Sequence, residues 1–276
     1  MRILITNDDG IYAKGIEVLR DVLAKEHDIF VVAPETEQSA VGHAITFLDP
    51  LRVKPVKRNG SFFGYAVNGT PADCIKLAIR ELMKEPPDMV ISGINIGANV
   101  GENVIYSGTV SAATEAAMLG FQSMAISINA YPATEFGAAI EYIPRLVHLL
   151  EHHKLPEGVS LNVNIPHLPA HRIKGIKITR QGHLKYKEAY DRRVDPRNRV
   201  YYWLCSQTAQ YDPHPDSDSY ALDQGYISIT PIHYDLTHYG TRDLLKKLGW
   251  EMNFTNEGDQ SDEVSFSSRQ RGGCYM

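Results

Sequence analysis

The chain has 276 residues, of which 43% are hydrophobic and 22% are charged, and its formal net charge is −5. This composition is typical of globular proteins and excludes collagen-like and disordered chains. The three cysteines show no CxxC spacing, and no apolar run reaches the roughly 18 residues of a membrane span, so we expect a cytoplasmic protein without a membrane segment. The acidic balance argues against duplex nucleic acid as a partner, because such proteins carry a clustered basic face.

The first half of the chain alternates short apolar runs with helical patterns. Residues 2–6 form an apolar run, apolar side chains recur at helical spacing over 16–23, and a second apolar run spans 29–33. This strand–helix–strand order predicts a βαβ unit and therefore a parallel sheet. Later segments repeat the pattern, with helices expected at 70–82, 109–119 and 136–150, and strands at 89–92, 124–128 and 161–165.

Other segments predict additions to this sheet. Alternating residues around Asn59-Gly60 predict a β-hairpin over 45–67, inserted beside the sheet. Proline, tyrosine and arginine become frequent after residue 166, which predicts a long excursion with hairpins, used as an arm between subunits. A strand at 226–230 and a helix at 241–248 follow.

We therefore predict an α/β fold with a Rossmann-like, doubly wound and mostly parallel sheet. The α/β core with the metal and phosphate site is expected at 1–165. The hairpin arm, the returning strand and the C-terminal helix are expected at 166–255. The polar residues 256–276 are expected to be a disordered tail.

Three polar segments follow predicted strands, at residues 7–10, 34–43 and 92–107. Ligands of open parallel sheets bind beyond the carboxyl ends of the strands. The three segments are therefore expected to share one edge of the sheet and to form the functional site.

Asp8 and Asp9 are adjacent acids at the end of the first predicted strand. Two neighbouring carboxylates repel each other unless a cation or a proton lies between them, and their hard oxygens suit Mg²⁺, Mn²⁺ or Ca²⁺. The alternative is that one of these acids merely caps the following helix.

The second polar segment contains Ser39 and His43. Ser39 could bind a metal or a phosphate, or its hydroxyl could bond only to its own loop. His43 could act as a general acid near neutral pH, or it could be a structural histidine.

The third segment has glycine or asparagine at every second position from Gly93 to Asn103. These residues tolerate positive φ and close backbone approach. The helix that follows opens with Ser107-Gly108-Thr109, and its first N–H groups and two hydroxyls suit an anion. The segment therefore predicts a phosphate cradle, and the alternative is a structural loop with a threonine N-cap.

Known nucleotide and hydrolase fingerprints do not occur in the expected places. There is no G-x-G-x-x-G after the first strand, no P-loop and no G-x-S-x-G elbow. The basic run over 192–199 is interpreted as a solvated or intersubunit face, with single-stranded nucleic acid as the alternative.

Taken in order, these segments resemble the SurE family, stationary-phase survival proteins that are metal-dependent nucleotidases. The likeness extends from residue 1 to about residue 250, and Glu115-Ala116 stands where the family pattern has Glu-Gly. The motifs that carry it lie at 3–10, 32–43, 68–74, 92–101, 106–113 and 229–237.

The resemblance implies hydrolysis of nucleoside 5′- and 3′-monophosphates, and of short polyphosphate, with a divalent metal, Mg²⁺ or Mn²⁺, and no organic cofactor. It implies a homodimer or homotetramer built through the C-terminal arms. The alternatives are a phosphatase for non-nucleotide esters and a regulatory module that binds nucleotides.

The resemblance also assigns roles to individual residues. The implied metal ligands are Asp8, Asp9, Ser39 and Asn95. The implied phosphate contacts are Ser39, Asn95, Ser107, Gly108 and Thr109. The residues implied to be catalytic are Asp8, Asn95, Ser107 and Thr109.

Overall fold

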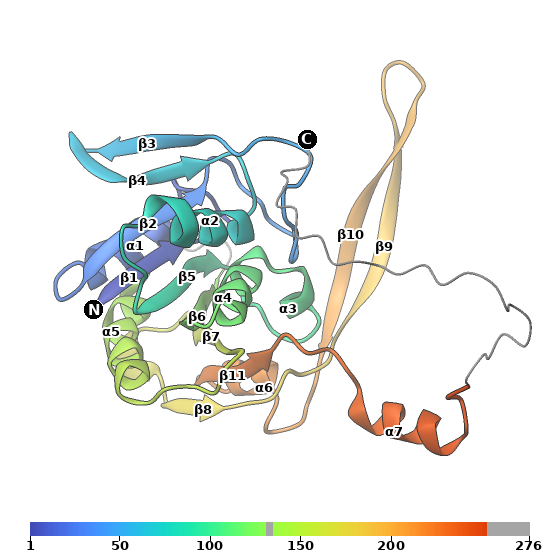
Figure 1. The fold of residues 1–276 in the computed structure, drawn as a ribbon. Helices are drawn as coiled ribbons and strands as arrows, with labels where there is room; N and C mark the ends of the chain where they lie inside the picture. The colour runs from blue at the N-terminus through green and yellow to red at the C-terminus, as the bar shows by residue number, and fades with distance from the viewer. Residues whose placement is uncertain (131–134, 253–276) are drawn as a thin grey trace, which may run out of the picture. The chain divides into compact units, whose positions relative to one another are not determined.

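The computed structural model describes residues 1–130 and 135–252. Nine strands form one mixed sheet in the order β3-β4-β2-β1-β5-β6-β7-β11-β8 (Figure 1). The strands from β4 to β7 run parallel to their neighbours, whereas β3 and β11 run antiparallel to β4 and β7. The strands are β1 (Arg2–Thr6), β2 (Asp28–Pro34), β3 (Val53–Arg58), β4 (Ser61–Val67), β5 (Met89–Ile96), β6 (Gln122–Asn129), β7 (Val159–Pro166), β8 (Ile176–Ile178) and β11 (Ile227–His233).

Helices cover both faces of this sheet, which confirms the predicted doubly wound α/β architecture (Figure 1). α1 (Lys14–Leu23) and α5 (Gly137–His152) lie on one face, and α2 (Pro71–Leu77) and α4 (Gly108–Met118) lie on the other. The shorter helical segments are η1 (Ala78–Leu82), α3 (Asn103–Tyr106), η2 (Ala170–Arg172) and α6 (Asp218–Asp223).

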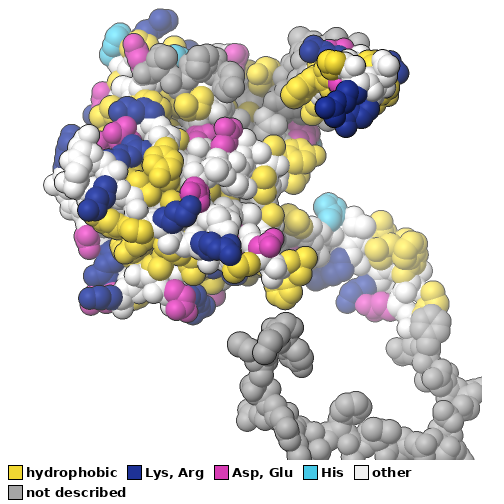
Figure 2. All heavy atoms as spheres, turned by 90° about the horizontal axis from the view of Figure 1, so that it is seen from above, with side chains coloured by type: hydrophobic (Ala, Val, Ile, Leu, Met, Phe, Trp, Pro, Cys, Tyr) yellow, Lys and Arg dark blue, Asp and Glu magenta, His cyan; other side chains and the backbone are white. Residues whose placement is uncertain are grey.

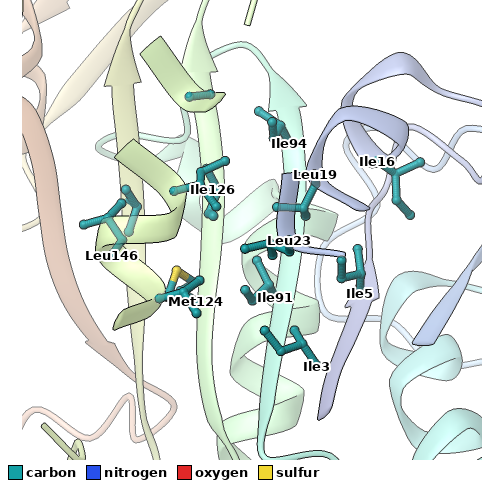
Figure 3. Close-up of a cluster of buried hydrophobic side chains, with 14 of the residues drawn as sticks. Ile3, Ile5, Ile16, Leu19, Leu23, Ile91, Ile94, Met124, Ile126 and Leu146 are labelled. Carbon is teal, nitrogen blue, oxygen red and sulfur yellow. The ribbon is translucent and has the colours of Figure 1, made fainter. Parts of the chain in front are cut away.

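The central strands are buried on both faces, as parallel strands usually are. Ile3 and Ile5 of β1 pack toward α1, while Leu4 between them packs on the opposite face with α2 and α4. Figure 3 shows the first of these two layers, with Leu19 and Leu23 of α1 facing the strands. The alternation places one hydrophobic layer on each side of the sheet and fixes the register of β1.

Several boundaries differ from the sequence prediction. β5 continues to Ile96 instead of ending at residue 92. The predicted hairpin has its turn at Asn59-Gly60, but β4 pairs with β2, so the hairpin forms one end of the main sheet instead of lying beside it. The helix after Thr70 opens with a capping box and a proline, but it becomes a π-helix over Ala78–Leu82.

Beyond residue 166 the described excursion is a single long hairpin, β9 (Leu184–Val194) and β10 (Val200–Tyr211). It pairs only with itself. β8 and α6 are not expected from the sequence, since a three-residue strand and a six-residue helix carry too little periodicity. β8 exists because it pairs with β11.

The chain divides into two compact units, residues 1–234 and 235–276. The second unit contains α7 (Tyr239–Lys247), close to the predicted helix at 241–248. The predicted tail at 256–276 lies outside the described residues. Within the described part of the chain, no helix combines the length and the apolarity that crossing a membrane requires.

The surface carries mixed charge. On the face shown in Figure 2, Lys and Arg side chains lie among acidic and hydrophobic ones and form no continuous stripe. In the basic run of the hairpin, Arg193 pairs with Asp191 at 2.7 Å and Arg199 pairs with Asp195 at 2.9 Å. These pairs favour a solvated or intersubunit face over a nucleic-acid site.

Candidate metal and phosphate site

One pocket of about 240 Å³ lies where β1, β2 and β5 end, at the carboxyl edge of the sheet. It is lined by residues from all three predicted polar segments. The sequence-predicted residues that line it are Asp8, Ser39, Asn95 and Ser107.

Asp8 is the buried acid of this pocket, and the residue is 4% exposed. The hydroxyl of Thr109 donates a hydrogen bond to its Oδ1 atom, and the backbone N–H groups of Gly108 and Thr109 also lie against the carboxylate. Burial raises the pKa of Asp8 above its usual value, although these donors act in the opposite direction. A carboxylate in this state gains strongly from a cation beside it.

Asp9 adds a second carboxylate next to Asp8. Its Oδ2 atom is buried and has no hydrogen-bond partner among the described residues. Burial of the carboxylate is the larger cause, and the negative charges of Asp8 and Glu37 are the next, of a rise in the pKa of Asp9 to about 7. Glu37 is not among the residues predicted for the site, because an acid in an exposed loop gives no local signal. A cation would relieve the repulsion among these three acids.

Asn95 lies near the end of β5. Its Nδ2 atom donates to the carbonyl of Gly97 at 2.8 Å, so Oδ1 is the atom that the side chain can offer to a cation. β5 pairs irregularly with β6 between Ser92 and Asn95. A Cβ on Gly93 would come within 2.4 Å of the Ile126 carbonyl oxygen, so only glycine permits this approach.

Ser39 is exposed at the pocket wall, and its hydroxyl donates to Glu37 at 2.6 Å. The backbone N–H of the preceding residue, Gln38, donates to the carbonyl of Asp8 at 2.7 Å. This bond ties the second polar segment to the first. Ser39 can therefore reach a ligand in the pocket once its hydroxyl leaves Glu37.

The start of α4 brings Ser107 and Gly108 to the same place. Ser107, not Thr109, is the N-cap, and its hydroxyl oxygen accepts from the N–H of Val110 at 3.1 Å. A Cβ on Gly108 would lie 2.8 Å from Cβ of Asp8, so glycine is needed for this close packing. The resemblance implies that Gly108 and Thr109 contact phosphate, whereas in the structure both contact Asp8 and only Ser107 lines the pocket.

His43 faces a different partner. Its Nε2 atom lies 2.8 Å from Glu115, a buried acid of α4 whose other oxygen accepts from Lys76 at 2.9 Å. Burial raises the pKa of Glu115, but the bonds from His43 and Lys76 together outweigh it and hold that pKa below its ordinary value. Because His43 does not line the pocket, this geometry favours the structural reading of His43 over a general acid.

A buried polar network holds the glycine-rich loop at the pocket wall. The N–H of Asn99 donates to Asn164 at 2.8 Å, and its carbonyl accepts from Asn162 at 2.7 Å and from Asn164 at 3.0 Å. Asn162 and Asn164 are not among the residues predicted for the site. The available signal was two amides at alternate positions of an apolar strand, which point to one face.

Asp218 holds the same loop from the other side and was also missed. The residue is fully buried at the start of α6. Its carboxylate accepts from the backbone N–H of Gly101 at 3.0 Å and of Gly182 at 3.0 Å. Asp218 therefore joins the pocket loop to the base of the β9–β10 hairpin.

The donor set fits a hard divalent cation. Asp8, Asp9 and Asn95 offer only oxygen ligands. The buried Oδ2 atom of Asp9 has no hydrogen-bond partner among the described residues, so a cation could bind it. Mg²⁺ and Mn²⁺ prefer such oxygens, whereas Zn²⁺ more often takes histidine or cysteine.

Comparison with known proteins identifies the family of this chain. The family model described as "Survival protein SurE" matches residues 3–188. The chain belongs to the SurE family. A 5′-nucleotidase SurE of Syntrophobacter fumaroxidans is 65% identical over 247 residues, which cover 90% of this chain and 99% of that relative. A 5′-nucleotidase SurE of Syntrophus aciditrophicus is 53% identical over 249 residues, which cover 90% of this chain and 94% of that relative.

A solved SurE structure has the same fold. The crystal structure of the SurE protein from Aquifex aeolicus superposes with a TM-score of 0.78 at 39% sequence identity, and the match covers 90% of this chain and all of that one. The family resemblance found in the sequence is thereby confirmed.

Proposed function

We propose that this SurE chain hydrolyses nucleoside 5′- and 3′-monophosphates to nucleoside and phosphate with a divalent metal, Mg²⁺ or Mn²⁺. The observation that carries this proposal is the pocket in which Asp8, Asn95 and Ser107 meet. The names of the relatives, 5′-nucleotidase SurE, support the same activity. Short polyphosphate contains comparable phosphate groups and is a second substrate class that we propose.

In this proposal Asp8, Asp9, Ser39 and Asn95 hold the metal. Asn95 and Ser39 are neutral, so they add ligand oxygens without adding negative charge that would repel the substrate phosphate. A bound divalent cation would supply charge neutralisation of the phosphoryl group and would orient water. The Ser107 hydroxyl oxygen already accepts from Val110, so its proton is available to a phosphate oxygen.

Thr109 and Gly108 act through Asp8 in this proposal. The Thr109 hydroxyl fixes the carboxylate, and Gly108 leaves room for it. Mutation of a residue that orients a metal ligand typically costs about 10–100-fold in metal affinity or activity. Direct contacts of the Gly108 and Thr109 N–H groups with phosphate would require those groups to leave Asp8.

Tyr106 supports a nucleotide over a simple phosphate ester. It lines the pocket and is 62% exposed, so its ring lies at the pocket mouth in contact with water. Aromatic side chains in such places stack on bases, and each stacked base contributes about 1–3 kcal/mol. We infer that the base of the substrate lies on this ring.

The same proposal includes a homodimer or homotetramer in the cytoplasm. The β9–β10 hairpin carries exposed apolar side chains on both faces, among them Tyr202, Trp203 and Leu204. An isolated two-stranded hairpin is at best marginally stable in water. A second copy of the chain would cover these side chains. Cys74 and Cys205, the cysteines that the structure describes, are both free, which suits a reducing compartment.

The test is phosphate release from AMP, GMP and 3′-AMP with Mg²⁺ or Mn²⁺, and again with excess chelator. We expect release that depends on metal and that Asp8→Asn removes. Asp21→Asn is the matched control, because Asp21 is an exposed acid on the outside of α1. β-Glycerophosphate tests a substrate without a base, and Tyr106→Ala should raise KM for AMP but not for this ester.

Three other results would contradict the nucleotidase proposal or the role of Asp8. Faster turnover of β-glycerophosphate than of every nucleotide would favour a general phosphatase. Tight nucleotide binding without phosphate release would favour a regulatory module. Full activity of folded Asp8→Asn would exclude Asp8 as an essential metal ligand.

A further inference from the structure

A second group of metal-binding side chains lies on the last turns of α5. His148, Glu151 and His152 are all exposed, and each offers one ligand atom within 4.8 Å of the other two. None of them lines the pocket at the carboxyl edge. The proposed nucleotidase reaction gives them no role.

Their spacing along the helix places them on one face. Residues separated by three or four positions are neighbours on a helix surface, so His148 faces both Glu151 and His152. The rings of His148 and His152 have centroids 4.2 Å apart. Two imidazoles in this arrangement can share one ion between them.

A backbone contact selects the ligand atom of His152. Its Nδ1 atom lies 2.8 Å from the carbonyl oxygen of His148. A carbonyl only accepts hydrogen bonds, so Nδ1 carries the proton and Nε2 keeps its lone pair. Histidines that bind metals usually donate their other N–H to such a group, which fixes the ring and its tautomer.

The cluster lies at the opposite edge of the sheet from the pocket. α5 leaves the carboxyl end of β6 and runs back toward the start of β7. Leu155, just beyond the cluster, exchanges hydrogen bonds with Gln122, the first residue of β6, with its N–H 2.7 Å from Oε1. A metal bound here therefore cannot touch a substrate in the pocket.

We propose that His148, Glu151 and His152 form a separate binding site for a transition-metal ion of the Zn²⁺ type. Two imidazoles and one carboxylate are a zinc-type donor set, and Mg²⁺, which prefers oxygen, would bind poorly. Bonds of about 2.0 Å require neighbouring donors about 3.3 Å apart, and exposed side chains can close that distance by changing rotamers. The bound ion links two consecutive turns and stabilises the C-terminal end of α5.

The experiment is a calorimetric titration of the untagged full chain with Zn²⁺. The titration is made in the Asp8→Asn background, so that the proposed catalytic metal site is weakened. We expect the background protein to bind one more equivalent of Zn²⁺ than the same protein carrying His148→Ala and His152→Ala. Zn²⁺ should also raise the melting temperature of the background protein more than that of the variant, and excess Mg²⁺ should not displace it.

His171→Ala is the matched control, because it removes one exposed imidazole outside the cluster, and it should keep the extra equivalent. Equal Zn²⁺ stoichiometry with and without His148 and His152 would overturn the proposal. In chains with native Asp8, the double histidine variant should keep full Mg²⁺-dependent phosphate release. This second measurement is independent of the first, so failure of the zinc site and failure of the nucleotidase proposal remain distinguishable.

Discussion

The orientation of the Asp8 carboxylate depends on residues that do not line the pocket. The Thr109 hydroxyl and the first N–H groups of α4 surround a carboxylate that has almost no contact with water. Position 108 requires glycine, because a Cβ there would collide with Asp8. The direction of the Asp8 carboxylate is therefore fixed by the first residues of α4.

Thr109→Val should weaken the metal affinity of the site without unfolding the chain. The change keeps the shape of the side chain but removes the donor to Asp8, so the carboxylate loses its fixed direction. Loss of such an orienting bond typically costs about 10–100-fold in metal affinity. Phosphate release measured against metal concentration should show this shift.

Thr109→Ser is the control for this prediction, since it restores the hydroxyl and should recover most of the affinity. An unchanged metal dependence in Thr109→Val would mean that the hydroxyl does not position Asp8.

Glu115 connects α4 to α2 and to the loop that carries His43. Its folded-state pKa is lowered, so its contribution to stability is present above the unfolded pKa and is lost as the pH falls through the folded value. Glu115→Gln should therefore destabilise the chain at pH 7, by about 1–2 kcal/mol for the weakened bonds to His43 and Lys76.

Urea unfolding at several pH values measures this effect. The difference between native chain and Glu115→Gln should shrink below about pH 4.5, the ordinary carboxyl value. Glu26→Gln, an exposed acid after α1, should show no such difference. A constant difference down to pH 3 would mean that the negative charge of Glu115 does not stabilise the fold.

Among the elements, those with a simple repeating pattern could be predicted and those fixed by distant partners could not. β1, α1 and β2 follow from apolar runs and helical spacing because the parallel sheet buries both faces of its strands. The end of β5 and α3 could not be placed, since the alternating Gly and Asn residues have no apolar period. The three segments at the carboxyl edge could be predicted from strand order alone.

The contacts that hold the glycine-rich loop at the pocket wall are the part of the site that could not be predicted from the sequence. Asp218 reaches Gly101 across a separation of 117 residues. No local motif marks such a contact, because it forms only when β11 returns to the sheet and brings α6 beside the loop. The alternate positions of Asn162 and Asn164 in an apolar strand gave a weak indication of a shared role, and no sequence pattern indicated the role of Asp218.

Asp218→Asn should lower kcat/KM while the chain stays folded. Gly101 donates to Oδ2 of Asp218 and Gly182 donates to Oδ1. An amide has only one oxygen, so its NH₂ group would face one of these two N–H groups, and the buried N–H left unpaired costs about 1–3 kcal/mol. The loop that carries Asn99 and Tyr106 should then lose its fixed position. Steady-state kinetics with AMP and thermal melting would separate the loss of activity from loss of fold.

Asp223→Asn serves as the matched change, because Asp223 is the exposed last residue of the same helix. It should leave kinetics unchanged. If both variants melt alike and both keep full kcat/KM, Asp218 does not position the loop.

At the scale of the whole molecule, the large apolar side chains that the structure describes on the β9–β10 hairpin are exposed to solvent. Tyr201 and Trp203 point to one face of the ribbon and Tyr202 and Leu204 point to the other, and all four are at least 40% exposed. Exposed apolar groups of this extent mark interaction surfaces. Asp218 holds the hairpin base and the pocket loop together, so an assembly through the arms would also restrain the site.

Replacing Trp203 and Leu204 by serine should therefore convert an oligomer into single chains. Each change removes a large apolar side chain from one face of the ribbon. None of the described hairpin residues lines the pocket, so the proposed metal binding at Asp8 should persist. Sedimentation velocity of the native chain and the double variant at equal concentration measures the assembly. Met118→Ser, which removes an exposed apolar side chain from α4, should leave the native assembly intact. A native chain that sediments as a single copy, or a double variant that still assembles, would mean that the hairpin is not the contact between copies.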